Sequence, residues 1–163
     1  MHVIRGLHNL TASHRGCVAT IGNFDGVHLG HVEILKRLII KSAHYKVPSV
    51  VILFEPQPAE FFRYGRIPAR LSRLSEKAQL IFACGVDKVL VLRFSRDLAS
   101  YSPQQFVEEI LVKRMGIKSL IIGDDFRFGT DRGGDFSLLT SLATKHHFSL
   151  DQTPPFLFIG KRI

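Results

Sequence analysis

The sequence predicts an α/β fold that is doubly wound around a parallel sheet, in a single domain over residues 1–163. Short apolar runs alternate four times with segments that show the 3.6-residue apolar period of a half-buried helix. The run at 50–54 is apolar throughout, which is typical of a strand covered by helices on both faces. No run approaches the roughly 18 apolar residues of a membrane span, so we expect no membrane partner.

The first part of the chain predicts a strand, a helix and a strand. Residues 1–15 indicate a lead-in strand and loop, and the β-branched residues at 17–21 indicate the first core strand. Helical spacing of apolar residues follows over 32–43, and Pro48 prevents its continuation before the strand at 50–54. We expect the crossover between the two strands to be right-handed and the strands to be parallel.

The rest of the chain continues the alternation. Ser102 is a good helix N-cap because Pro103 follows it and Gln105 stands three residues later. The elements expected after residue 70 are a helix over 72–84, a strand over 88–92, a helix from 102 to 115, a strand over 118–122, a helix over 136–146 and a last strand over 156–159.

The net charge and the cysteine content indicate which class of ligand the protein binds and in which cellular compartment it is found. The net charge of +8 favours anionic partners, but the basic residues are spread along the chain and form no nucleic-acid reading motif. We therefore expect small phosphorylated ligands and no nucleic acid. Cys17 and Cys84 lack the spacing of a disulfide framework or a zinc site, and the first residues lack the apolar core of a signal peptide. These features favour the cytoplasm.

The glycine-rich segment 21–31 joins the first core strand to the first helix. His28 and His31 stand three residues apart, beside a helix N-terminus whose free N–H groups carry a partial positive charge. Gly26 and Gly30 allow close approach of a ligand, so the segment suits phosphate. A cap or a solvated face is the alternative for such a histidine pair. A metal site would need a third ligand, and no suitably spaced residue supplies one, so we predict no protein metal site.

Two commoner phosphate motifs are absent from the sequence. It contains no G-x-x-x-x-G-K-[ST] string, and no G-x-G-x-x-G follows a strand. Kinase-type and dinucleotide-oxidoreductase functions are therefore disfavoured. In open parallel sheets, ligands bind where loops leave the carboxyl ends of strands, so the loops at 22–31, 55–62 and 123–135 should converge on one crevice.

The string Ile21-Gly22-Asn23-Phe24-Asp25-Gly26-Val27-His28-Leu29-Gly30-His31 contains His-x-Gly-His after a strand and resembles the signature of the nucleotidyltransferase superfamily. The full string, with residues 54–58 and 123–129, is similar to the FMN adenylyltransferase (FAD synthetase) domain of bacterial bifunctional riboflavin kinase/FMN adenylyltransferase, and the likeness runs from Arg5 to Ile163. The resemblance implies a Rossmann-like fold of nucleotidyltransferase type. It also implies ATP with Mg²⁺ and FMN as substrates, and FAD and pyrophosphate as products.

The resemblance also implies site residues. The implied catalytic residues are His28 and His31, which would contact the ATP phosphates. The ATP-binding turn would comprise Gly22, Asn23, Phe24 and Gly26 together with the two histidines. The implied FMN-binding residues are Pro56, Pro58, Phe62, Asp125, Arg127 and Phe128. Core packing is the alternative for Phe62 and Phe128, and the helical period of Phe106 favours the core.

Relatives continue after this region with a second signature, Ser-Ser-Thr-x-x-Arg, and with a riboflavin kinase barrel, whereas the last residues here are Gly160-Lys161-Arg162-Ile163. We therefore expect a C-terminally shortened domain without riboflavin kinase activity. The alternative to a working FMN adenylyltransferase is a catalytically impaired remnant that binds nucleotide or flavin. The loop at 123–129 disfavours another cytidylyl- or adenylyltransferase of the superfamily. The sequence leaves the oligomeric state open.

Overall fold

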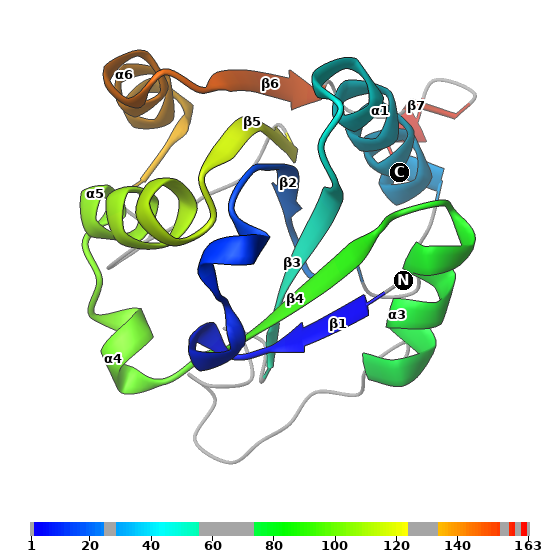
Figure 1. Ribbon diagram of the computed structural model, residues 1–163. Coiled ribbons are helices and arrows are strands. Elements are labelled where there is room, and N and C mark those ends of the chain that lie inside the picture. The colour runs from blue at the N-terminus through cyan, green and yellow to red at the C-terminus, as the bar shows by residue number, and fades with distance from the viewer. Residues whose placement is uncertain are drawn as a thin grey trace.

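The computed structural model describes residues 2–24, 29–55, 74–123, 134–153, 157–158 and 161–162. Within these residues, six strands form one parallel sheet in the order β1-β4-β3-β2-β5-β6 (Figure 1). The predicted doubly wound parallel sheet is confirmed. Its strands are β1 (His2–Arg5), β2 (Cys17–Ile21), β3 (Ser49–Glu55), β4 (Lys88–Arg93), β5 (Ile117–Gly123) and β6 (Ser149–Thr153).

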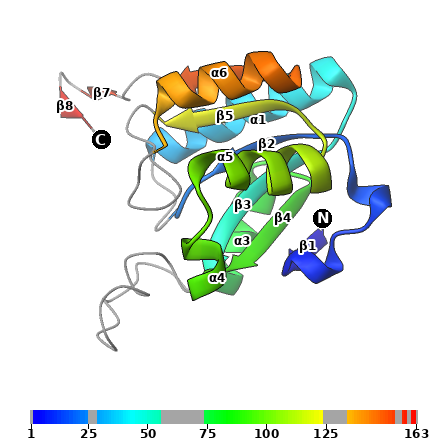
Figure 2. The same cartoon turned by 90° about the vertical axis from the view of Figure 1, so that its left-hand side faces the viewer.

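Helices cover both faces of the sheet. Figure 1 shows α1 and α3 to the right of the sheet and α5 and α6 to the left, and Figure 2 shows the same layers from the side. The described helices are η1 (Leu7–Asn9), η2 (Ala12–His14), α1 (Leu29–Tyr45), α3 (Leu74–Ala83), α4 (Arg96–Ala99), α5 (Pro103–Gln105), η3 (Phe106–Arg114) and α6 (Phe136–His146). None of these described helices is long and apolar enough to cross a membrane.

Each face of the sheet has its own apolar core. Because side chains alternate along a strand, Val18 of β2 packs with Leu35 and Leu38 of α1 and with Ile81 of α3. The neighbouring residues of β2 point to the other face, where they join residues of η3 and α6. Cys17 lies in this second core, and burial raises the pKa of its thiol to about 12. The thiol is therefore a buried apolar group rather than a nucleophile.

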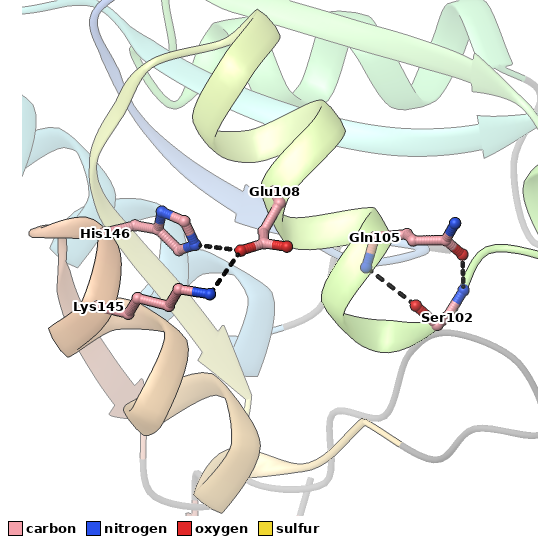
Figure 3. A network of polar contacts seen from close by, with 5 residues as sticks. All are labelled: Ser102, Gln105, Glu108, Lys145 and His146. Atoms are coloured by element: carbon pink, nitrogen blue, oxygen red, sulfur yellow. Dashed lines mark hydrogen bonds and ion pairs between the residues drawn. The ribbon is translucent and has the colours of Figure 1, made fainter.

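The helix that Ser102 begins changes its hydrogen bonding after one turn. The predicted capping box is present: the Ser102 hydroxyl accepts from the Gln105 backbone N–H, and the Gln105 side chain accepts from the Ser102 backbone N–H (Figure 3). From Phe106 to Arg114 the chain is a π-helix, in which the Met115 N–H donates to the Ile110 carbonyl at 3.0 Å. Apolar spacing predicted a helix here, but it does not reveal this wider winding.

A charged cluster fastens η3 to α6. The Glu108 carboxylate lies 2.6 Å from Nε2 of His146 and 3.3 Å from Nζ of Lys145 (Figure 3). The hydrogen bond from His146 is the main cause that holds the pKa of Glu108 below its ordinary value, and Lys145 adds to it. The cluster joins two helices that cover the same face of the sheet.

The last strand of the sheet differs from the sequence prediction. The strand beside β5 is Ser149–Thr153, which the sequence analysis left unassigned. Within the expected strand at 156–159, Leu157–Phe158 forms β7, which pairs antiparallel with β8 (Lys161–Arg162) in a separate sheet. A strand therefore lies within the expected range 156–159, but β6 was missed because it is an edge strand with polar residues and lacks the apolar run by which buried strands are recognised.

We predict that Glu108→Gln lowers the melting temperature at neutral pH. A carboxyl whose pKa is depressed in the folded state stabilises the fold above its ordinary pKa of about 4.3, and this stabilisation disappears as the pH falls through the depressed value. The difference between wild type and variant should therefore be present at neutral pH and vanish in acid, as measured by thermal unfolding against pH. Glu109→Gln is the control, since Glu109 is exposed and lies 3.8 Å from Lys113. A pH-independent difference would contradict this assignment.

We also predict that Thr20→Val stabilises the protein by about 1–3 kcal/mol, because burying a hydroxyl without a partner is costly. The Thr20 side chain is fully buried, and its Oγ1 has no hydrogen-bond partner within the part of the chain that the structure describes. Thr153→Val is the matched control, since Thr153 Oγ1 donates to the Ile122 carbonyl at 3.0 Å and its loss should destabilise the fold. Denaturant unfolding measures the change in the free energy of unfolding for each variant. A lower free energy of unfolding for Thr20→Val than for the wild type would contradict the prediction.

Candidate functional site

The strand order points to the carboxyl edge of the sheet beside β2 as the candidate ligand-binding position. From β2 the chain adds β3 and β4 on one side, and it then returns to add β5 and β6 on the other. The connections leaving β2 and β5 therefore diverge, and in open parallel sheets ligands bind in the crevice at the carboxyl ends of such strands. Gly22 follows β2 and Gly123 ends β5, so both glycine-rich segments of the sequence leave the sheet at this point.

A helix N-terminus lies at the same edge. Helix α1 begins at Leu29, runs for 17 residues and has no acidic residue in its first turn. Its free N–H groups and its dipole therefore favour an anion at this end, and no carboxylate of that turn competes for the place. The predicted strand before the glycine-rich segment and the predicted helix after it are confirmed, and residues 25–28 between them lie outside the described residues.

The described residues 22–24, which follow β2, are anchored in the core by Phe24. Phe24 has a positive φ of 53°, and its side chain is only 2% exposed. Its ring belongs to the core that contains Leu35 and Leu38 of α1. A Cβ on Gly22 would lie 2.8 Å from Cε2 of Phe24, so the ring occupies the space that a side chain at position 22 would need.

His31, the third residue of α1, is half-buried beside this ring. The centroids of the His31 and Phe24 rings are 4.9 Å apart, with the ring planes tilted by 47°. Helical side chains point toward the helix N-terminus, so His31 projects from the helix back toward the turn. The imidazole therefore lies at the N-terminal end of α1 and packs against a ring of the core.

Aromatic residues gather at the ends of the next two strands. Phe54 of β3 contacts Phe94 edge to face at 5.7 Å between ring centroids, and it also contacts Phe106 of η3 at 6.4 Å. Phe106 is 4% exposed, as expected for a core residue. The sequence analysis did not single out Phe94. Phe94 directly follows β4 and Phe54 is the next-to-last residue of β3, so an aromatic residue near the end of each of two neighbouring strands is the signal that could have found it.

The structure describes four of the predicted site residues and brings them together: Gly22, Asn23, Phe24 and His31. Asn23 is exposed, and Phe24 is in the core. The predicted residues outside the described part of the chain are Gly26, His28, Pro56, Pro58, Phe62, Asp125, Arg127 and Phe128. The strands that precede the last six, β3 and β5, both end at the carboxyl edge. Among described residues, no group of three or more His, Cys, Asp or Glu could hold a metal ion.

Comparison with known proteins identifies the family. The family model for FAD synthetase matches residues 10–163. The chain belongs to the FAD synthetase family. Bifunctional riboflavin kinase/FMN adenylyltransferase of Escherichia coli strain K12 is 48% identical over 164 residues, and that of Pseudomonas fluorescens is 48% identical over 163 residues. Each match covers 100% of this chain and 52% of the relative, so this FAD synthetase family member spans about half the length of these curated relatives.

A solved structure supports the same architecture. The crystal structure of a protein titled macrolide-efflux protein from Streptococcus pneumoniae superposes with a TM-score of 0.83 at 23% identity. The match covers 99% of the FAD synthetase family chain and 52% of the other chain. At this identity the likeness concerns the fold alone.

Proposed function

We propose that this chain is an FMN adenylyltransferase, which transfers AMP from ATP to FMN and releases FAD and pyrophosphate. Family membership and the bifunctional relatives support the reaction class. The observation that carries the proposal is the position of His31, in the first turn of α1 at the divergence of β2 and β5. That position combines an imidazole with a helix N-terminus, a setting that favours phosphate.

The reaction requires alignment and charge stabilisation. A phosphate oxygen of FMN attacks the α-phosphorus of ATP, the bond from that phosphorus to the bridging oxygen breaks, and pyrophosphate leaves with the electron pair. The protein forms no covalent bond in this step, so its contribution is to orient the two substrates and to stabilise the developing negative charge. We assign the second task to His28, His31 and the N–H groups at the start of α1. Mg²⁺ would enter with ATP as part of the substrate.

The remaining predicted residues receive binding roles in this proposal. Gly22, Asn23 and Gly26 would receive the nucleotide, and the loops after β3 and β5 would hold FMN through Pro56, Pro58, Phe62, Asp125, Arg127 and Phe128. Apolar and aromatic residues suit a flat flavin ring. We place the reaction in the cytoplasm, because that compartment keeps thiols reduced and Cys17 and Cys84 are free cysteines.

The first test is direct measurement of FAD. Purified protein with ATP, Mg²⁺ and FMN should form FAD and pyrophosphate in equal amounts, measured by chromatography, and CTP in place of ATP should give no flavin dinucleotide. Calorimetry with ATP and with FMN distinguishes the alternative. Binding of either ligand without FAD above background would contradict the proposal and identify a binding remnant.

We predict that His31→Ala lowers kcat about 10²- to 10³-fold, the usual cost of removing one donor that stabilises transition-state charge. His44→Ala is the matched control, because His44 is an exposed residue in the last turn of the same helix. Circular dichroism should show both variants folded. Equal kcat values for the two variants would contradict the proposed role of His31 in stabilising the transition state.

A further inference from the structure

Phe24 has a left-handed backbone conformation, although it does not stand at the end of a helix, where this conformation is common. Among the described residues, three that are not glycine have positive φ: Phe24 at 53°, Lys46 at 57° and His147 at 61°. Lys46 directly follows α1 and His147 caps α6, and helices commonly end in this conformation. Phe24 instead lies three residues after a strand. For an aromatic residue this conformation is strained, because it brings the Cβ too close to the following carbonyl oxygen.

The conformation turns the ring of Phe24 back into the core. The side chain is 2% exposed, and the burial of its apolar ring offsets the strain. Gly22 makes room for it, since a Cβ there would lie 2.8 Å from Cε2 and 3.2 Å from Cδ2 of the ring. Gly22 has no positive φ of its own, so space rather than backbone freedom accounts for the glycine.

The buried ring in turn contacts His31. The separation of 4.9 Å and the tilt of 47° fall within the range of favourable aromatic pairs. An imidazole on a helix can rotate about two side-chain torsions, and a fixed ring against one side limits that rotation. Gly22, Phe24 and His31 thus form a chain of contacts from the end of β2 to the first turn of α1.

We infer that Phe24 is a positioning residue for His31: its ring holds the imidazole in the orientation from which it reaches phosphate, and it does not itself contact the nucleotide. The resemblance placed Phe24 among ATP-binding residues, but a ring that is 2% exposed offers almost no surface to a ligand. The inference rests on the proposed function for its effect on catalysis. Its structural part, the restriction of His31, is independent of that function.

Phe24→Leu tests the inference, because leucine keeps an apolar side chain in the core and removes the ring. Phe148→Leu is the matched control: Phe148 is 6% exposed, belongs to the other core and follows α6 at the amino edge of the sheet. NMR relaxation gives the order parameter of the His31 imidazole, assigned by comparison with His31→Ala. We expect it to fall in Phe24→Leu and to match wild type in Phe148→Leu.

Kinetics supply the second measurement. Phe24→Leu should lower kcat about 10- to 100-fold with an unchanged KM for FMN, as expected when a catalytic group is misplaced by about 1 Å. A raised KM for ATP with unchanged kcat would overturn the inference, because that pattern marks a contact made equally in the ground and transition states. An unchanged imidazole order parameter would also overturn it. If the wild type makes no FAD, the order parameter still decides whether Phe24 restrains His31.

A double-mutant cycle with Gly22→Ala examines the chain of contacts. Alone, Gly22→Ala should displace the Phe24 ring and lower the order parameter of the His31 imidazole. Added to Phe24→Leu, it should have little further effect, because the ring it displaces is gone. Additive effects of the two substitutions would show that Gly22 does not act through Phe24, and this would overturn the proposed chain.

Discussion

The parallel pairing of β2 with a neighbour on each side is the constraint on which the rest of the structure depends. All five residues of β2 are buried, and the strand is hydrogen-bonded to β3 and to β5. Each face of β2 must therefore be covered by helices, and a parallel strand needs a crossover before its neighbour can pair. Helix α1 is that crossover between β2 and β3, and its N-terminus necessarily lies at the carboxyl edge.

The same constraint brings the candidate site and the core into contact. The chain leaves the sheet at Gly22, and Phe24 returns to the core within two residues. The turn is consequently held by burial of an aromatic ring, and His31 packs against that ring. Under the proposed function, the position of the His31 imidazole depends on core packing, so a substitution in the core around Phe24 should affect catalysis without touching a substrate.

Much of this arrangement could be predicted from the sequence. Apolar runs with β-branched residues identified β2, β3, β4 and β5, and the capping pattern at Ser102 identified the start of α5. The sequence did not predict edge strand β6, because its residues, Ser149–Thr153, are mostly polar and pair with a neighbouring strand on one side only. The left-handed conformation of Phe24 and the packing of its ring on Gly22 follow from tertiary contacts, which no local pattern of residues encodes. Gly26 and Gly30 were predicted to allow close approach of a ligand, whereas the glycine at position 22 leaves space for the ring of Phe24.

The proposed function requires that a nucleotide bind at the carboxyl edge of the sheet, where the connections of β2 and β5 diverge. Titration of the ¹⁵N-labelled protein with ATP and Mg²⁺, followed through the glycine amides, tests it most directly. Gly22, Gly30 and Gly123 lie at this edge, whereas Gly85 and Gly116 lie at the opposite edge, before β4 and β5. We expect the amide resonances of the first three glycines to shift with a common dissociation constant while those of the last two stay in place. Shifts confined to Gly85 and Gly116 would contradict it.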